Sequence, residues 1–318
     1  MIRYLVTGGA GFIGSHIVNA LCRRGDYVRV IDDFSTGSID NLYGVIDDID
    51  LICGDITDEK IVNQGMKNID IVYHQAALPS VLRSIEDPMA THNACATGTI
   101  NLLNAAVKAG VSRLIYAASS SAYGDCDQVS KKESFPNNPL SPYAAAKLSG
   151  ELYCKAFSAS MGLTTVALRY FNVFGPRQDP NSPYSAVIPL FISAIAKGNH
   201  PVIYGDGLQS RDFTYIDNVI HANLLAASAP ENRVNARVFN VGQGGSISLI
   251  ELLKYICEEM QTEVQATYEK PREGDVRHSC ANLSLSKSLL GYKPKIDFRS
   301  GLSNTIQFYS NKYKVCLS

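Results

Sequence analysis

The chain has 318 residues, which at roughly 150 residues per domain leaves room for two domains or one large one. Hydrophobic residues make up 46% and charged residues 19%, a composition typical of a folded globular protein that argues against disorder. Lys plus Arg total 29 and Asp plus Glu total 30, which gives a formal net charge of −1. This balance argues against a strongly basic surface that would bind nucleic acid or a membrane by charge. No stretch approaches the ~20 apolar residues that span a bilayer, and the first residues contain no apolar run followed by a cleavage site, so we expect a cytoplasmic protein.

Short apolar runs and helical segments alternate from the first residues onward. The apolar runs, rich in Val, Ile, Leu and Tyr, predict buried strands over Tyr4–Thr7, Tyr27–Ile31, Asp50–Cys53, Ile69–Gln75, Arg113–Ser119, Thr164–Arg169 and Val238–Val241. The segments between and around them predict helices over Gly14–Arg24, Asp58–Met66, Met89–Ala109, Pro142–Met161, Val187–Ala196 and Asp217–Ala227. Such alternation indicates an α/β fold: a doubly wound parallel sheet with right-handed crossovers and helices on both faces.

The remainder of the chain predicts a smaller α/β lobe. Past Ile247 we expect a helix over Leu249–Met260, a short extended piece over Gln265–Glu269 and a polar segment over Lys270–Ser279. The predicted division is a nucleotide-binding domain over residues 1–175, with later returns near 212–242, and a substrate lobe over 176–211 and 243–318.

The eight cysteines are scattered and contain no C-x-x-C pair. This spacing predicts free thiols in a reducing compartment. Neither the cysteines nor the histidines have the spacing of metal ligands, so no metal site is expected. The histidines considered are His16, His74, His92, His221 and His278.

A glycine-rich turn follows the first predicted strand. In the run from Thr7 to Gly14, T-G-G-A-G-F-I-G, the glycines allow a tight turn, close approach of backbone N–H groups to a pyrophosphate, and close packing of helix on strand. The start of the following helix offers unpaired N–H groups and a partial positive charge to the phosphates. The second strand ends in Ile31-Asp32-Asp33, and Asp32 lies 18 residues beyond Gly14. A carboxylate there accepts hydrogen bonds from ribose hydroxyls and repels a 2′-phosphate, which favours NAD over NADP in a Rossmann-type fold.

A tyrosine and a lysine lie four residues apart on one predicted helix. Tyr143 and Lys147 therefore share a face, and an ammonium near a phenol lowers a pKa that is ordinarily near ~10. Tyr143 is thus a candidate proton acceptor. Ser119 ends a predicted strand 24 residues earlier, at the sheet edge where ligands bind, so its hydroxyl is expected to meet the phenol and a substrate oxygen.

Five motifs together resemble one known family. They are T-G-G-A-G-F-I-G, S-S-S-A-Y-G at Ser119–Gly124, Y-A-A-A-K at Tyr143–Lys147, R-Y-F-N-V-F-G-P-R-Q at Arg169–Gln178 and R-E-G-D at Arg272–Asp275. Over nearly its whole length the chain resembles extended short-chain dehydrogenase/reductases, and among them the nucleotide-sugar 4-epimerases. Related sugar dehydratases typically carry Thr-Asp-Glu where this chain has three serines, which counts against elimination of water.

The resemblance implies roles for particular residues. The catalytic group would be Ser119, Tyr143 and Lys147, with Tyr143 taking the proton of the sugar 4-hydroxyl while C4 passes a hydride to tightly held NAD. The implied cofactor contacts are Gly8, Gly11, Phe12, Ile13, Gly14, Asp32, Asp33, Ser35, Thr36, Gly37, Asp55, Ile56, Gln75, Ala76, Ala77, Tyr143, Lys147 and Tyr170. The implied contacts with a UDP-sugar are Ser80, Arg83, Ser120, Ser121, Asn172, Gln178, Ala186, Val187, Tyr204, Arg211, Arg272, Asp275 and Ser279.

The identity of the sugar depends on a few of these positions. Epimerases restricted to sugars without an acetamido group carry a bulky Tyr at the position matching Ser279, so the serine leaves room for an N-acetyl group. The Ser-Val-x-Arg-Ser pattern at Ser80–Ser84, the three serines, Gln178 and Ala186 also resemble the group selective for N-acetylglucosamine, although Pro79 stands where that group often has Gly. We expect a 4-epimerase of UDP-N-acetylglucosamine and UDP-N-acetylgalactosamine, with turnover of UDP-glucose and UDP-galactose left open.

Three further interpretations follow from the sequence. An epimerase for UDP-glucose or UDP-glucuronate is the alternative within the enzyme class, since Arg83 could bind a uronate carboxylate. A non-catalytic NAD(H)-sensing regulator is the alternative from another class, because a fold alone does not establish chemistry. The resemblance also implies a homodimer joined by a four-helix bundle of Met89–Ala109 and Pro142–Met161.

Overall fold

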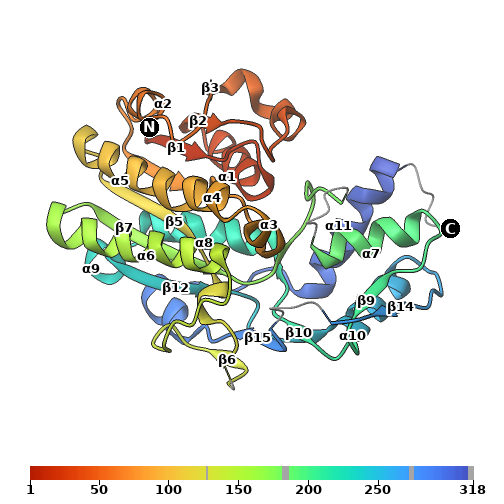
Figure 1. The fold of residues 1–318 in the computed structure, drawn as a ribbon. Helices are drawn as coiled ribbons and strands as arrows, with labels where there is room; N and C mark the ends of the chain where they lie inside the picture. Colours follow the sequence, from red (N-terminus) through yellow and green to blue (C-terminus); the bar gives the residue numbers. More distant parts are fainter. Residues whose placement is uncertain (127, 181–185, 272–275, 314–318) are drawn as a thin grey trace.

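The computed structural model describes residues 1–126, 128–180, 186–271 and 276–313. A parallel sheet, ordered β12-β7-β5-β4-β1-β2-β3, forms the larger part of the molecule (Figure 1). Its strands are β1 (Arg3–Thr7), β2 (Tyr27–Asp32), β3 (Ile49–Cys53), β4 (Ile71–His74), β5 (Arg113–Ser119), β7 (Thr164–Tyr170) and β12 (Arg237–Val241). The strand order reverses between β1 and β4, so the connections that leave their carboxyl ends run to opposite sides of the sheet and open the crevice in which open α/β sheets bind ligands. The predicted doubly wound α/β fold is confirmed.

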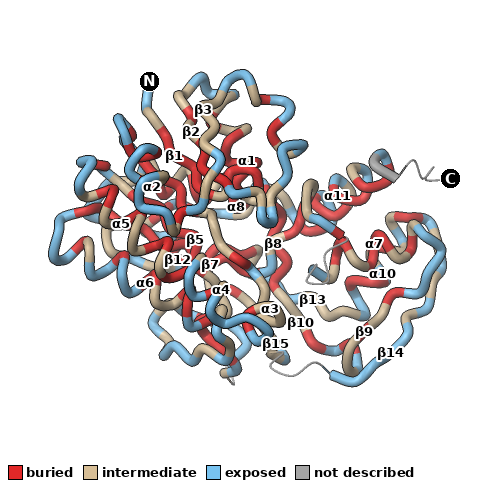
Figure 2. The backbone as a smooth tube through the Cα atoms, turned by 45° about the horizontal axis from the view of Figure 1, so that its top comes forward, coloured by how far each residue is buried: buried red, intermediate tan, exposed pale blue. Residues whose placement is uncertain are grey.

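Helices cover both faces of this sheet. One face carries α1 (Phe12–Cys22), η1 (Ile39–Asp48) and α8 (Ile216–Ser228), and the other carries α2 (Glu59–Gly65), α4 (Pro88–His92), η2 (Asn93–Thr97), α5 (Gly98–Ala109) and α6 (Pro142–Met161). Alternate residues of β1 enter different cores: Tyr4 and Val6 pack on the α1 side and Leu5 on the α5 side. Figure 2 shows the buried residues running along these strands and the helix faces turned toward them. None of the helices described is both long and apolar enough to cross a membrane.

Local sequence explains where the helices begin and end. The Ser141 hydroxyl accepts the N–H of Ala144 at 3.1 Å and caps the start of α6, while Pro142 occupies the first helical position. Helices α5 and α6 end at Gly110 and Gly162, both with left-handed φ values of 70° and 72°. These boundaries match the predicted ones because caps, proline and glycine are local signals.

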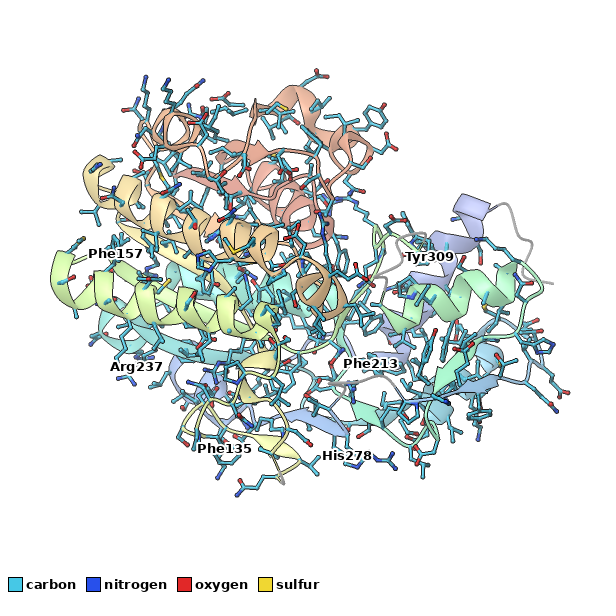
Figure 3. The ribbon with its side chains drawn as sticks, viewed as in Figure 1. Phe135, Phe157, Phe213, Arg237, His278 and Tyr309 are labelled. Carbon is cyan, nitrogen blue, oxygen red and sulfur yellow. The ribbon has the colours of Figure 1, made fainter. Side chains whose placement is uncertain are left out.

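The smaller part of the molecule is built from short elements. The short strands of this part, together with the short strands that pair with them, are β6 (Ser130–Lys131), β8 (Val173–Phe174), β9 (Val202–Tyr204), β10 (Ser210–Arg211), β11 (Thr214–Tyr215), β13 (Ile247–Ser248), β14 (Thr267–Glu269) and β15 (His278–Ala281). Its helices include α7 (Val187–Ala196), α10 (Leu249–Glu259) and α11 (Phe298–Tyr313), which contact one another. Phe213, which follows β10, and Tyr309, on α11, both lie in this part, away from Phe157 on α6 (Figure 3).

The remaining short elements connect these layers. They are α3 (Val81–Glu86), η3 (Ser120–Tyr123), α9 (Glu231–Val234) and η4 (Ser286–Leu290). The predicted helix over 89–109 corresponds to α4, η2 and α5, which follow one another without a gap and have the π-turn η2 in the middle. Strand β14 lies within the extended piece predicted over Gln265–Glu269, whereas the other short strands of the smaller part and α11 were not predicted.

Candidate active site

A cleft of about 1230 Å³ opens at the carboxyl ends of the sheet strands. It is larger than the roughly 300–1000 Å³ of ordinary small-molecule sites, so it has room for two ligands. Nearly all the residues that the sequence predicted for cofactor and substrate line it. Among the predicted cofactor contacts these are Gly8, Gly11, Phe12, Ile13, Gly14, Asp32, Asp33, Ser35, Thr36, Asp55, Ile56, Gln75, Ala76, Ala77, Tyr143, Lys147 and Tyr170. Among the predicted catalytic and substrate residues they are Ser119, Ser80, Arg83, Ser120, Ser121, Asn172, Gln178, Ala186, Arg211 and Ser279.

Three predicted residues lie elsewhere. Val187 and Tyr204 line a neighbouring cavity of about 230 Å³, which Asn172, Ala186 and Arg211 share with the main cleft. Gly37 is not on the cleft wall: a Cβ placed there would come 2.9 Å from the Asp32 carboxylate, so this glycine permits the loop to pack on that aspartate. Arg272 and Asp275 lie outside the described residues.

The glycine turn after β1 is built for close backbone approach. Gly8 has a φ of 65°, and a Cβ on Gly14 would come 2.0 Å from the Gly8 carbonyl oxygen. Helix α1 begins there with no side chain capping its N-terminus and no acidic residue in its first turn. Phe12 and Ile13 bring N–H groups of that turn to the cleft, whereas the Gly11 N–H donates to the Gly8 carbonyl at 3.2 Å. A side-chain-free cradle facing uncapped N–H groups suits a pyrophosphate.

Asp32 lies beside this turn at the end of β2. Its carboxylate accepts the N–H groups of Ala10 and Phe34, each at 2.8 Å. Burial raises the pKa of Asp32, and these backbone donors oppose that effect. Each carboxylate oxygen keeps a further lone pair, so Asp32 can still accept a ribose hydroxyl. Asp33, by contrast, is exposed and bonds the backbone and hydroxyl of Ser35. The cradle and this carboxylate together fit a dinucleotide without a 2′-phosphate.

Tyr143 enters the cleft from the first turn of α6, and Lys147 follows one turn later. Burial raises the pKa of Tyr143, and a hydrogen bond with Ser119 lowers it. The expected effect of Lys147 on this phenol is not seen, because the ammonium lies over the ring of Tyr116, 4.6 Å from its centroid. Lys147 is itself almost fully buried, and burial lowers its pKa. In this conformation desolvation of the phenol therefore has a larger effect on its pKa than the Lys147 ammonium has.

Tyr116 holds the helix that carries this pair. Its hydroxyl donates to the backbone carbonyl of Lys147 at 3.1 Å, and both residues are buried. Gly150 allows this approach, since a Cβ there would come 2.2 Å from the Tyr116 hydroxyl oxygen. Tyr116 on β5 thus fixes the depth at which α6 packs on the sheet.

The opposite wall of the cleft comes from the smaller part of the molecule. Arg211 and Ser279 lie side by side in the paired strands β10 and β15. Next to Arg211, the fully buried Asp212 carboxylate accepts the N–H groups of Gln243, Gly244 and Ala281 at 2.6, 2.9 and 3.0 Å. This carboxylate ties three distant segments together and so sets the positions of Arg211 and Ser279 relative to the sheet.

Other predicted substrate residues differ in how free their polar groups are. The Ser80 hydroxyl accepts the N–H of Arg83 and caps α3. The Gln178 amide is engaged with the backbone of Gly175 and Val173, at 3.3 and 3.0 Å, so it holds its own loop. The half-buried Arg83 guanidinium has no hydrogen-bond or ion-pair partner within the described parts of the chain and faces the cleft.

Sequence reasoning missed some residues of the cleft wall. Asn93 and Thr97 lie on the π-turn η2, and Lys131 is fully buried with its ammonium donating to the Cys126 carbonyl at 2.8 Å. A run of small residues does not by itself predict a π-turn. Lys131 lies in a stretch with neither helical nor strand periodicity, and its burial depends on β6 pairing with β15. Among the described residues no group of three or more His, Cys, Asp or Glu could hold a metal ion.

Comparisons with known proteins agree on one family. Residues 4–242 match the model of the NAD dependent epimerase/dehydratase family. The UDP-glucose 4-epimerase of Mycolicibacterium smegmatis is 34% identical over 315 residues, covering 98% of this chain and 99% of that protein. The structure of a UDP-N-acetylglucosamine 4-epimerase from Methanobrevibacter ruminantium M1, in complex with UDP-N-acetylmuramic acid, is similar with a TM-score of 0.93 and 41% identity, over 98% of this chain and 99% of that one. A UDP-glucose 4-epimerase from Thermus thermophilus, in complex with NAD, gives 0.88 and 34%, over 97% and 99% of the two chains.

Proposed function

The chain belongs to the NAD dependent epimerase/dehydratase family, and from this premise we propose that it interconverts UDP-N-acetylglucosamine and UDP-N-acetylgalactosamine. It is an isomerase of the extended short-chain dehydrogenase/reductase type, an NAD-dependent 4-epimerase of nucleotide sugars. The observation that carries the choice of sugar is Ser279, a small residue on the cleft wall beside Arg211. Its short side chain leaves volume for an acetamido group, and the similar structure from Methanobrevibacter ruminantium M1 is of a UDP-N-acetylglucosamine 4-epimerase.

The residues of the cleft divide between the two ligands. The glycine turn and the start of α1 would hold the pyrophosphate of NAD, and Asp32 its adenosine ribose. Arg211 and Asn172 would hold the diphosphate of the sugar nucleotide, since a guanidinium suits a diphosphate and both residues border the main cleft and the neighbouring cavity. Val187 and Tyr204 would then contact the nucleoside in that cavity.

The proposed chemistry is a proton transfer at the sugar 4-hydroxyl coupled to oxidation of C4. When bound, NAD supplies a hydride acceptor for C4 and, in its oxidised form, a positive charge beside the phenol. Tyr143, as the phenolate, accepts the hydroxyl proton and later returns it, and a hydrogen bond donated by Ser119 would stabilise the phenolate oxygen before the proton arrives. The 4-keto sugar turns over within the cleft, anchored by the nucleotide, and is reduced from its other face.

The test is a parallel incubation of purified protein with UDP-N-acetylglucosamine, UDP-glucose and UDP-glucuronate, first without and then with added NAD. Chromatography or NMR resolves the 4-epimers. Conversion of UDP-N-acetylglucosamine at the highest kcat/KM supports the proposal, and failure on all three sugars with NAD present contradicts it. Tyr143→Phe is the control, and it should lower kcat by about 10²–10⁴-fold while leaving the fold unchanged. A sensor that does no chemistry would keep its ligand response in that variant.

Arg83 favours a second candidate substrate. A half-buried guanidinium without a partner among the described residues suits a carboxylate, so an acidic sugar such as the glucuronate is the alternative. The two candidates separate in the variant Arg83→Gln. Loss of UDP-glucuronate turnover alone, with UDP-N-acetylglucosamine unaffected, would assign Arg83 to an acidic sugar.

We also propose that the protein is a homodimer. An exposed apolar face crosses three helices that contact one another, with Ile85 on α3, Met89 on α4, and Leu152 and Tyr153 on α6. Leu152 and Met89 are 59% and 64% exposed, and the helical segments 89–109 and 142–161 of a second copy would cover them in a four-helix bundle. Light scattering of the wild type and of Leu152→Glu tests this, with a dimer expected for the first and a monomer for the second.

For the domains we propose the division expected from the sequence, with residues 1–175 and the returns near 212–242 binding NAD, and 176–211 with 243–318 binding the sugar nucleotide. The support for it is that α8 and β12 join the sheet layers, whereas α7, α10 and α11 pack on one another.

A further inference from the structure

Three consecutive serines follow one another where β5 gives way to η3. Ser119 is the last residue of the strand and caps η3, and Ser120 and Ser121 form the start of that short helix. All three are partly exposed and line the cleft. Their hydroxyls nevertheless have different environments, and this difference assigns them different tasks.

The Ser119 oxygen receives two hydrogen bonds from one residue. The backbone N–H of Ser121 donates to it at 3.2 Å, and the Ser121 hydroxyl lies 2.8 Å from it. The Ser120 hydroxyl, by contrast, has no hydrogen-bond partner within the described ranges of the chain. It is free to contact a ligand, whereas the Ser121 hydroxyl is already engaged.

Counting donors and acceptors shows what these two bonds leave free on Ser119. A serine hydroxyl has one hydrogen to donate and two lone pairs that accept. When the Ser121 N–H and hydroxyl both donate to Ser119, both lone pairs are filled and the single Ser119 hydrogen remains for another acceptor. In the proposed mechanism that acceptor is the phenol oxygen of Tyr143, which lines the same cleft. An acceptor that gains negative charge strengthens such a chain, because charge-assisted hydrogen bonds are stronger and neighbouring bonds polarise one another.

We propose that Ser121 is a positioning residue for the epimerisation: it holds Ser119 as a hydrogen-bond donor to Tyr143. The inference rests on the proposed function, and it replaces a direct sugar contact for Ser121 with a role exerted through Ser119. Ser120 is left as the serine of this group that contacts the sugar.

The kinetic test compares Ser121→Ala, Ser121→Thr and Ser120→Ala in the full-length protein. Removing the Ser121 hydroxyl frees a lone pair on Ser119, which then donates less strongly, so kcat should fall about tenfold with KM changed less than about twofold. The pH–rate profile of Ser121→Ala should move to higher pH, because the phenol then loses its proton less readily. Ser121→Thr keeps a donor and should restore both values. Ser120→Ala should instead raise KM for UDP-N-acetylglucosamine without moving the profile.

A second measurement needs no turnover. In protein labelled with ¹³C at the tyrosine ζ carbon, the resonance missing from Tyr143→Phe belongs to Tyr143. It should move in Ser121→Ala, stay in place in Ser120→Ala, and return in Ser121→Thr. An unmoved resonance in Ser121→Ala, or a defect confined to KM, overturns the inference while leaving the epimerase intact. A resonance that moves as expected in a protein inactive on every UDP-sugar overturns the proposed function and leaves the hydrogen-bond chain standing. The backbone N–H of Ser121 remains in every variant, so the cap of η3 is preserved.

Discussion

At the scale of single residues, Ser279 is a small side chain on the wall of the cleft, next to Arg211 in the paired strand. Replacing it with tyrosine adds a ring where an acetamido group is expected to lie. Ser279→Tyr should therefore lower kcat/KM for UDP-N-acetylglucosamine roughly 10- to 100-fold and affect UDP-glucose far less. Initial rates with both sugars give the ratio. Equal losses on both, or unchanged turnover of the N-acetylated sugar, would remove the steric argument.

The partly buried histidine His16 makes stability depend on pH. Its Nε2 lies 3.0 Å from the Pro176 carbonyl oxygen, and burial lowers the pKa of His16 from 6.5 to about 4. The unfolded chain therefore takes up a proton below pH 6.5 that the folded protein refuses until about pH 4, so stability is lost as the pH falls through this window. At pH 5 this one residue should lower the free energy of unfolding by about 2 kcal/mol relative to pH 7.5.

Urea denaturation at the two pH values checks this expectation. His16→Gln keeps an amide that can donate to Pro176 but has no proton to take up. Its stability should fall less between pH 7.5 and 5 than that of the wild type. An unchanged difference would mean that His16 is protonated in the folded protein at pH 5.

The sequence predicted the residues whose roles depend on short spacing. The patterns that predicted them were the glycine turn, the end of a strand and the spacing of one helical turn. They pointed to Gly14, Asp32, Tyr143 and Lys147, all of which line the cleft. The orientation of Lys147 toward Tyr116 could not be predicted, since it depends on how deeply α6 packs on β5. The same holds for the buried Lys131, which a strand more than a hundred residues later covers.

At the scale of elements, the packing of α6 on β5 depends on a residue without a side chain. A methyl group on Gly150 would meet the Tyr116 hydroxyl oxygen at 2.2 Å and the adjoining ring carbon at 2.4 Å. Since both residues are buried, Gly150→Ala should lower the free energy of unfolding by about 1–3 kcal/mol and also reduce kcat, because α6 carries Tyr143 and Lys147.

Gly44 offers a matched control. It has nothing within 4 Å of the added Cβ and no left-handed φ, so Gly44→Ala should leave stability and kcat close to the wild type. Thermal unfolding and steady-state rates compare the two variants. A Gly150→Ala protein of normal stability would show that α6 can move away from β5 at little cost.

Elements with an unbroken apolar run or a local end signal were predicted to the residue, as for β5, α6 and α7. Strands β10 and β11 have two residues each, too few for any periodicity. Each pairs with a segment elsewhere in the chain, β10 with β15 and β11 with β8. Helix α11 was missed because its sequence, FRSGLSNTIQFYSNKY, is rich in residues with poor helix propensity. Burial of Leu302, Ile306 and Tyr309 against the rest of the protein stabilises it instead.

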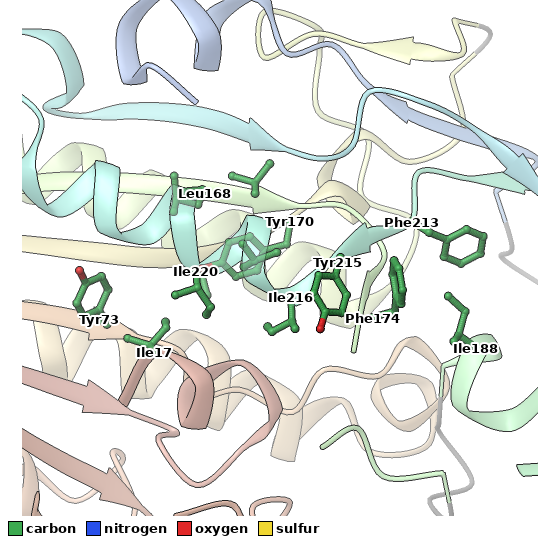
Figure 4. Packing of buried hydrophobic residues seen from close by; sticks show 14 of the residues in the cluster. Ile17, Tyr73, Leu168, Tyr170, Phe174, Ile188, Phe213, Tyr215, Ile216 and Ile220 are labelled. Atoms are coloured by element: carbon green, nitrogen blue, oxygen red, sulfur yellow. The ribbon is translucent and has the colours of Figure 1, made fainter. Parts of the chain in front are cut away.

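At the scale of the whole molecule, one hydrophobic core joins the sheet to the smaller part. Figure 4 follows it from Ile17 and Leu168 through Ile220 and Ile216 to Phe213. The rings of Phe174, Phe213 and Phe298 pack at centroid distances of 5.4 and 6.0 Å along this path. The two parts therefore share buried surface and are not separated by a solvated linker.

This continuity predicts a single cooperative unfolding transition. Urea curves followed by circular dichroism, by tyrosine fluorescence (the chain has no Trp) and by activity should coincide. A fragment of residues 1–175 should not fold alone, because it lacks β12 and α8 and exposes the core they cover. Two separated transitions would show that the smaller part unfolds on its own.

The position of β15 also governs when the enzyme becomes able to act. Its residues His278–Ala281 bring Ser279 to the cleft and close the edge of β10, yet they lie more than 130 residues after Tyr143 in the sequence. A ribosome makes the glycine turn and Tyr143 before this strand, so a nascent chain holds half a cleft until β15 has been made. Sugar nucleotides can be processed only after β15 has emerged, and a chain truncated before Ser279 should yield no partially working product.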